Sequence, residues 1–257
     1  MKLRIYDEGL ELSYRNMPPV WIHVSILFLV VFITVPIWKD FTASDIITAL
    51  LVAFGIIFSI FAHEVAHAWA AVRLGHRATM IVMSSAGGTA IWETDRYRRR
   101  DDCLITMAGP LANLALGLFC LTIYHLFAID PMAGPTLGPD GSWYDPEPLL
   151  PWFVLRTLDW LSVLNFVWTF VNLLPAYPLD GGHLLSNLLE ARFGRRRALF
   201  WTGLCGTVLA VLSKVIFCVG VLGGLVILCP PAFRPNISAL KASRLKPPRL
   251  VSRRTSS

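Results

Sequence analysis

Long runs of apolar residues dominate the chain and are separated by shorter polar or basic segments. A helix needs about 20 mostly apolar residues to cross a bilayer, and several of these runs approach or exceed that length. One run of 31 residues begins at Ala198, and Lys214 together with glycines beyond it predicts a break near residue 215. The predicted membrane spans are residues 20–38, 46–72, 103–129, 150–174, 198–214 and 216–229.

Residues 80–93 have a different pattern, because they are apolar and β-prone and are broken by Gly87 and Gly88. They predict two short strands with a glycine turn at the membrane interface, where exposed backbone must pair or line a cavity. We therefore expect an all-α polytopic membrane protein of about six transmembrane helices, with a small β-like membrane-associated loop after the second span. The predicted regions are a cytoplasmic segment (1–19), a membrane-embedded domain (20–229) and a basic, disordered cytoplasmic tail (230–257).

Composition agrees with a membrane protein. Of the 257 residues, 55% are hydrophobic and 16% are charged, whereas a soluble domain has about 25% charged residues. This excludes an ordinary soluble domain and a disordered chain. The five cysteines lie in or beside apolar runs without a CxxC pair, so we expect small buried side chains and not disulfides or metal ligands.

The distribution of basic residues predicts the orientation in the membrane. If the N-terminus is cytoplasmic and the spans alternate, 20 of the 23 Lys and Arg residues lie on the cytoplasmic side. The outer side keeps only Lys39, Arg156 and Lys214. By the positive-inside rule both ends of the chain are then cytoplasmic, and the net charge of +6 indicates a lipid bilayer as partner and no nucleic acid.

The second predicted span carries a short motif with the composition of a metal site. It reads HEVAH and contains His63, Glu64 and His67. Residues four apart share one face of a helix, so both imidazoles can reach one ion, and Glu64 can take a proton from its water. Zinc accepts imidazole and carboxylate ligands and leaves one position for water in catalytic sites. Because ionisable residues are costly inside a membrane, we interpret the motif as a zinc site and not as polar residues that hold helices together.

Such a site needs a third protein ligand, and Asp180 is the candidate. It lies in the sequence VNLLPAYPLDGGH at the cytoplasmic end of the fourth predicted span. Pro175 and Pro178 break a helix there, and Gly181 and Gly182 allow a sharp turn, so an unwound segment can direct the carboxylate toward a neighbouring helix. The alternative is that Asp180 caps the next helix, because Asp is a favoured N-cap residue.

Three motifs together resemble the site-2 protease family of intramembrane zinc metalloproteases. They are HEVAH, AGPLAN at residues 108–113 and NLLPAYPLDGG at residues 172–182, and the resemblance extends over about residues 19–230. It implies one zinc ion (Zn²⁺) per chain, held by His63, His67 and Asp180. No segment between predicted spans exceeds about 30 residues, so the chain resembles the minimal, core-only branch, without an inserted PDZ domain or an appended CBS domain.

The resemblance also implies roles for four further residues. Glu64 would be the general base and later the proton donor. Asn172, eight residues before Asp180, would steady the substrate carbonyl or oxyanion. Gly87 and Gly88 match the Gly-Gly of a β-like loop that is thought to pair with an extended substrate segment.

We therefore expect a metalloendopeptidase that hydrolyses a peptide bond in or near a transmembrane segment of a membrane protein, in regulated intramembrane proteolysis. Its partners would be that substrate and the lipid bilayer, and the sequence leaves the oligomeric state open. The core-only architecture favours a multi-pass protein of the bacterial inner membrane.

Two other functions fit parts of the pattern. A catalytically silent binder or chaperone of membrane helices would need no base, so the intact Glu64 argues against it. A zinc transporter would place polar groups along a path through several spans, whereas here they cluster on one side. We expect His23 to be an interfacial residue, with modulation of the site as the alternative, and Asn113 to be a helix–helix bonding residue, with a catalytic role as the alternative. Asn165 is the second candidate for the oxyanion role.

Overall fold

The computed structural model describes residues 2–14, 17–38, 40–85, 87–94, 98–128, 136–137, 143–144, 148–222 and 233–244. The chain divides into two compact units, Met1–Asn172 and Leu173–Ser257. The first unit carries the HEVAH motif, and the second carries Asp180.

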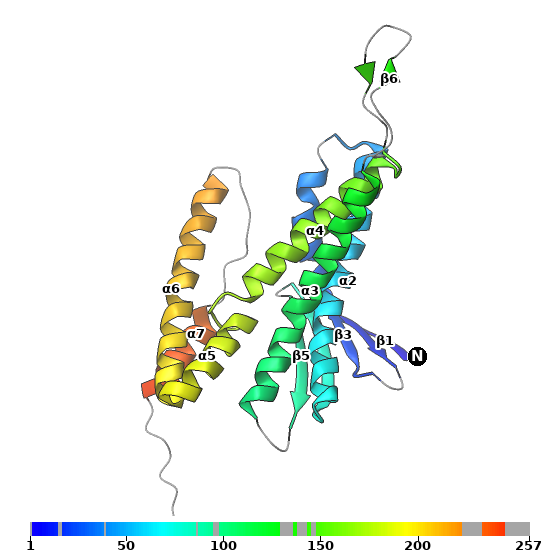
Figure 1. The fold of residues 1–257 in the computed structure, drawn as a ribbon. Helices are drawn as coiled ribbons and strands as arrows, with labels where there is room; N and C mark the ends of the chain where they lie inside the picture. Colours follow the sequence, from blue (N-terminus) through cyan, green and yellow to red (C-terminus); the bar gives the residue numbers. More distant parts are fainter. Residues whose placement is uncertain are drawn as a thin grey trace, which may run out of the picture. The chain divides into compact units, whose positions relative to one another are not determined.

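Three long apolar helices form the body of the first unit (Figure 1). They are α2 (Ala43–Arg73), α3 (Arg99–Phe127) and α4 (Trp152–Asn172), and each packs against the other two. All three are long and apolar enough to cross a membrane, and they cover the second, third and fourth predicted spans. A capping box at Thr42 and Asp45, in which each side chain accepts a hydrogen bond from the other's backbone N–H, fixes the start of α2.

The first predicted span, residues 20–38, differs from the prediction because it is not one helix. It consists of strand β3 (Val20–His23), helix α1 (Ile26–Thr34) and the 3-10 turn η1 (Val35–Ile37). Val20–Ile22 pair in parallel with Ile81–Met83, so their backbone belongs to a sheet. The apolar helical part is therefore only Ile26–Ile37. This is shorter than a helix that crosses the membrane, which needs about 20 residues.

A five-stranded sheet in the first unit is larger than the predicted β-like loop. That loop forms the antiparallel hairpin of β4 (Arg77–Ser84) and β5 (Gly87–Glu93), as expected. The N-terminal segment adds β1 (Lys2–Tyr6) and β2 (Gly9–Ser13), and the strand order is β1-β2-β3-β4-β5. Among the described strands β5 pairs only with β4, so it is an edge strand. Two short strands, β6 (Thr136–Leu137) and β7 (Trp143–Tyr144), pair with each other between α3 and α4.

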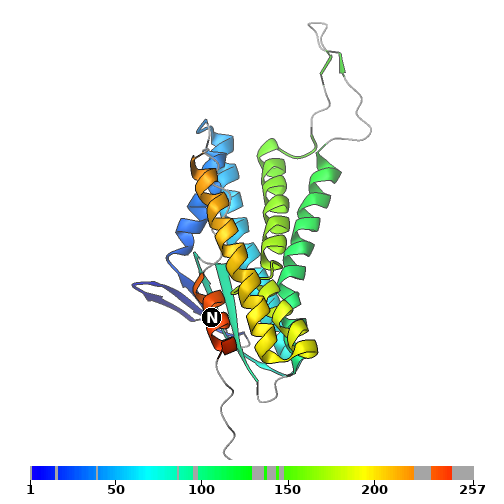
Figure 2. The same cartoon turned by 90° about the vertical axis from the view of Figure 1, so that its left-hand side faces the viewer.

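The second unit is built around one long helix. Helices α5 (Asp180–Phe193) and α7 (Phe233–Arg244) pack on α6 (Arg195–Leu222), which Figure 2 shows as one continuous helix. The break predicted near residue 215 is not present, because Lys214 lies inside α6. The rest of the predicted sixth span, residues 223–229, lies outside the described residues.

The C-terminal tail also differs from the prediction of disorder for residues 230–257. Helix α7 has a buried face made of Asn236, Ala239 and Ser243, which follow one another at the spacing of helical turns. Packing of this face on α6 stabilises a short helix that its polar composition alone would not hold. Residues 245–257 lie outside the described residues.

Candidate metal centre

Helix α2 carries the HEVAH side chains on its buried part. His63, Glu64 and His67 are only 5%, 4% and 8% exposed. The two histidines lie one turn apart, and their rings meet edge to face with centroids 4.7 Å apart. They form a polar centre in an otherwise apolar helix, where buried ionisable groups require partners or a metal.

The neighbouring helix fixes the protonation of His67. Its Nδ1 lies 2.7 Å from the carbonyl oxygen of Ile105 in α3. A carbonyl can only accept a hydrogen bond, so Nδ1 carries the proton and donates it. Nε2 therefore keeps its lone pair for a metal, and this kind of backbone contact is the one that orients metal-binding histidines.

The Nε2 atoms of the two histidines face a common position. They lie 3.0 Å apart. In a tetrahedral zinc site with Zn–N distances of about 2.0–2.1 Å, two nitrogen ligands are about 3.3 Å apart. The distance between the two nitrogen atoms is therefore close to the spacing that one zinc ion requires.

Gly109 of α3 faces these two nitrogen atoms. A Cβ atom at this position would lie 2.6 Å from Nε2 of His63 and closer still to Nε2 of His67. Any side chain at Gly109 would thus occupy the space in front of the imidazoles. The sequence indicates close helix packing at this glycine of the AGPLAN motif, but it does not indicate that the glycine faces the two histidines.

The β4–β5 hairpin reaches Glu64. A Cβ atom at Gly88 would lie 2.6 Å from the carboxyl carbon of Glu64 and closer to its Oε1, so the carboxylate lies directly against the backbone of β5. Gly87 has a positive φ of 105° and no neighbour within 4 Å of a Cβ position. The two glycines therefore differ: Gly88 leaves room for Glu64, and Gly87 adopts a backbone conformation that favours glycine.

The last two predicted residues lie at the end of the first unit and near the start of the second. Asn172 is the half-buried C-terminal residue of α4. Asp180 is half-buried and is the first residue of α5, whose N-cap is Leu179, so the alternative of Asp180 as the N-cap does not hold. Gly182 allows a close approach, because a Cβ there would lie 2.7 Å from the backbone nitrogen of Tyr177.

The other polar residues considered beside the site have contacts of their own. The side-chain amide of Asn165 donates to Ser59 Oγ at 3.0 Å and links α4 to α2. His23 Nδ1 accepts a hydrogen bond from the backbone N–H of Ser25 at 3.0 Å. Asn113 is 1% exposed inside α3. Asn165 and His23 therefore have hydrogen bonds within the protein, and Asn165 uses its amide nitrogen to link two helices.

Comparison with known proteins decides the family. The sequence profile of peptidase family M50 matches residues 51–136 and 130–213, which include both histidines and Asp180. The chain belongs to peptidase family M50. This confirms the resemblance to site-2 proteases that the three motifs indicate.

Two curated relatives of this M50 chain align with it over only part of their own length. A zinc metalloprotease of Methanocaldococcus jannaschii is 28% identical over 177 residues, which cover 68% of this chain and 44% of that protein. Rip3 of Mycobacterium tuberculosis is 30% identical over 136 residues, which cover 53% of this chain and 30% of that protein. The M50 chain thus spans less than half the length of these curated relatives.

A solved structure has a similar fold. The Site-2 Protease from Methanocaldococcus jannaschii matches with a TM-score of 0.56 and 21% sequence identity, over 91% of this chain and 93% of that chain. At this identity the likeness concerns the fold. It places the helices and the small sheet of the M50 chain among site-2 protease folds.

Proposed function

We propose that this M50 chain is a zinc metalloendopeptidase that hydrolyses a peptide bond in or near a transmembrane segment of a membrane protein. One observation carries the proposal: the Nε2 atoms of His63 and His67 lie 3.0 Å apart beside Glu64, on a helix that is long and apolar enough to cross a membrane. Helix packing alone does not require two imidazoles and a carboxylate at such a position.

One zinc ion per chain would be held by His63, His67 and Asp180. These residues offer two imidazole nitrogens and one carboxylate oxygen, which is a donor set that can hold a metal ion. Zinc accepts this set, and when bound it supplies the Lewis acidity that polarises a carbonyl and lowers the pKa of a water to about 7. The zinc metalloprotease among the relatives supports the choice of ion.

Glu64 would move the proton. Its buried carboxylate follows His63 directly in α2, takes a proton from the attacking water and passes it to the leaving amine. A positioned acid–base group of this kind contributes about 10²–10⁴-fold to the rate. Asn172 would donate a hydrogen bond from its side-chain amide to the substrate carbonyl oxygen as negative charge develops, which is worth about 10²–10³-fold for one donor.

The edge strand β5 would hold the substrate. A transmembrane helix hides its peptide bonds in internal hydrogen bonds, so it must become extended before cleavage. An edge strand can pair with an extended segment through main-chain hydrogen bonds. Gly87 and Gly88 belong to this strand, and Gly88 lies against Glu64, so a segment paired with β5 would pass near the general base.

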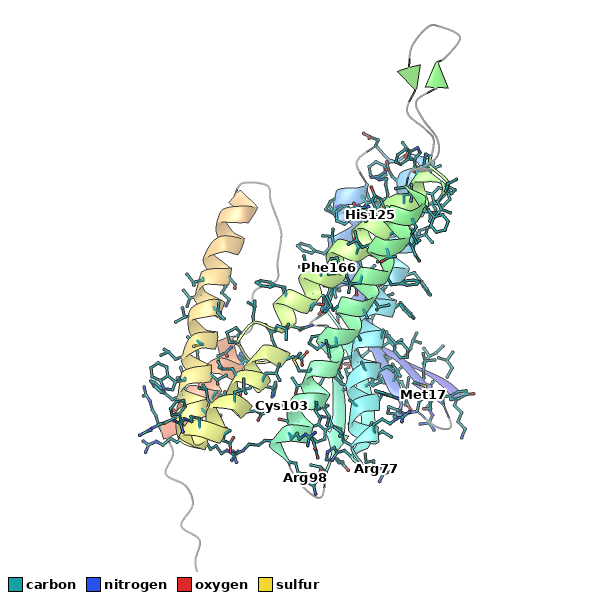
Figure 3. All side chains as sticks on the ribbon, viewed as in Figure 1. Met17, Arg77, Arg98, Cys103, His125 and Phe166 are labelled. Carbon is teal, nitrogen blue, oxygen red and sulfur yellow. The ribbon has the colours of Figure 1, made fainter. Side chains whose placement is uncertain are left out.

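We further propose a multi-pass membrane protein with both ends of the chain in the cytoplasm. Figure 3 shows Arg77 and Arg98 at the end of the first unit opposite His125, which supports a cytoplasmic position of that end by the positive-inside rule. His67 lies close to the end of α2 at Arg73, so water would reach the site from the cytoplasm. The setting would be regulated intramembrane proteolysis in a bacterial inner membrane, with a membrane protein and lipid as partners.

The test compares cells that carry the native chain with cells that carry Glu64→Gln. We expect membrane-protein fragments only with the native chain, and equal zinc content in both proteins. Glu8→Gln, at an exposed carboxylate in the turn between β1 and β2, is the matched control and should leave the fragments unchanged. Identical fragments and biological activity with Glu64→Gln would contradict proteolysis and favour the silent binder, whereas metal flux into liposomes that requires His63 or Asp180 would favour a transporter.

A further inference from the structure

Helix α7 contains a polar residue that is completely buried. Asn236 is 0% exposed, whereas most of the other described side chains of this helix are exposed. A fully buried amide is stable only when its donor and acceptor are both used. The partners of Asn236 therefore show what α7 holds in place.

Both ends of the Asn236 amide bind the same residue, Tyr177. Oδ1 accepts a hydrogen bond from the backbone N–H of Tyr177 at 2.9 Å, and Nδ2 donates to its carbonyl oxygen at 2.6 Å. A primary amide has one acceptor and one donor group, and here they match the N–H and C=O of one residue. Asn236 thus holds the backbone at Tyr177 from 59 residues away in sequence.

Tyr177 lies three residues before Asp180, in the segment 173–179 that links α4 to α5 and is not helical. Backbone groups in such a segment lack the regular partners that a helix would provide, so each external hydrogen bond restricts its path. Two turn bonds continue from Tyr177's neighbours toward Asp180: Leu179 N–H to Ala176 O at 2.9 Å, and Gly182 N–H to Leu179 O at 3.0 Å. The restraint at Tyr177 is therefore transmitted to the first turn of α5.

Two glycines of α6 let Asn236 reach this segment. A Cβ atom at Gly206 would fall on the Asn236 amide and would lie 3.1 Å from the Cα atom of Ala176. At Gly203 it would lie 2.9 Å from the Asn236 carbonyl oxygen and 3.0 Å from Leu240 Cγ. The absence of side chains at Gly203 and Gly206 thus leaves space on α6 for Asn236 to reach residues 176 and 177.

We propose that Asn236 is a positioning residue for Asp180. By fixing the backbone of Tyr177, α7 sets the path of residues 176–179 and hence the direction of the Asp180 carboxylate. This inference rests on the proposed role of Asp180 as a zinc ligand. It assigns to the C-terminal helix a part in building the metal site, although none of its own side chains is a ligand in our proposal.

The experiment measures zinc affinity of the full-length chain in detergent, by competition with a chelator, together with hydrogen exchange of residues 173–182 in the metal-free protein. Asn236→Ala should weaken zinc binding about 10–100-fold, the usual cost of losing a partner that orients a ligand, and should speed exchange in the segment. Asn236→Asp keeps the shape and the acceptor but turns the donor into a second oxygen that faces the Tyr177 carbonyl, so it should weaken zinc binding in the same direction and at least as much. It also keeps the test usable if Asn236→Ala does not fold.

Leu240→Ala is the control, because Leu240 packs α7 on Gly203 without bonding to the 173–179 segment in the described contacts. It should lower the Tm but leave zinc affinity within about twofold. If Asn236→Ala weakens zinc no more than Leu240→Ala, or leaves exchange unchanged, the inference is overturned. If Asp180→Ala weakens zinc and Asn236→Ala does not, this inference alone fails, whereas unchanged affinity in Asp180→Ala overturns the proposed ligand as well.

Discussion

The histidine pair depends on two features of α3 that are not themselves ligands. The carbonyl oxygen of Ile105 fixes the proton of His67 on Nδ1, and the missing side chain at Gly109 leaves space before both Nε2 atoms. Gly88 gives the same kind of space to the carboxylate of Glu64. Substitutions at Gly109 should therefore affect zinc binding, whereas substitutions at Gly88 should affect catalysis.

Gly109→Ala should abolish zinc binding while α3 stays intact. The added methyl group would fall on Nε2 of both histidines. Alanine favours a helix over glycine by about 1 kcal/mol, so a weaker helix would not explain the loss. We expect zinc affinity to fall by about 100-fold or more, as measured by chelator competition.

Gly117 provides the matched control on the same helix. A Cβ atom there would lie 3.0 Å from the ring of Phe166 and touches neither histidine. Gly117→Ala should keep native zinc affinity. If Gly109→Ala and Gly117→Ala bind zinc equally well, the space in front of the imidazoles is not where the metal binds.

Gly88→Ala should reduce cleavage but keep zinc. The methyl group would displace the Glu64 carboxylate from the backbone of β5 without touching either histidine in the described contacts. We expect a loss of about tenfold or more in kcat, within the range that a misplaced acid–base group costs. Cleavage assays paired with zinc analysis check this, and a native rate would show that the Gly88 contact does not position the base.

The long helices could be predicted from the sequence, because an apolar segment that spans a bilayer as a helix needs about 20 residues. Residues 43–73 are helical where the apolar run predicts a span. The run at 20–38 misled the prediction, because its first residues are taken into the sheet through Val20, Trp21 and Ile22. Hydropathy alone does not distinguish a buried strand from the beginning of a buried helix.

The full sheet and the C-terminal helix could not be predicted from the local sequence pattern, because both depend on tertiary contacts. The strands β1 and β2 form because each finds a partner elsewhere in the chain, with Lys2 opposite Ser13 and Gly9 opposite His23. Helix α7 depends on Gly203 and Gly206 of α6, which leave space for it. It also depends on the hydrogen bonds between Asn236 and Tyr177, which are 59 residues apart in the sequence. The HEVAH motif could be predicted because helical spacing is local, whereas the roles of Gly88 and Gly109 come from contacts across elements.

An ion pair joins the first turn of α2 to the second turn of α4. Arg156 Nη1 lies 2.7 Å from Asp45 Oδ1, with the Asp45 side chain 6% exposed and Arg156 42% exposed. Arg156 is one of the few basic residues assigned to the outer side, and this carboxylate balances its charge. Arg156→Ala should lower the stability of the chain, because it removes the counterion of the Asp45 carboxylate and leaves that carboxylate with its capping contacts only.

Thermal unfolding in detergent measures this cost as a lower Tm. The double variant Asp45→Asn with Arg156→Ala should recover part of the loss, since no buried charge then lacks its counterion. Strictly additive effects of the two substitutions would show that the pair contributes nothing to stability.

For the whole molecule, the central proposal is that one zinc ion is bound by His63, His67 and Asp180 of this M50 chain. His63 and His67 lie in α2 with Glu64 beside them, and Asp180 is the first residue of α5. A shared ion would make metal binding and the stability of the chain interdependent, because a ligand that binds only the folded state stabilises it.

Zinc K-edge X-ray absorption of the purified native chain and of Asp180→Ala tests this claim most directly. We expect one zinc per chain with two imidazole nitrogens and a carboxylate oxygen at about 2.0–2.2 Å, and loss of that oxygen or of the zinc itself in the variant. Sulfur ligands at about 2.3 Å, or a native spectrum that Asp180→Ala leaves unchanged, would contradict the proposed metal site.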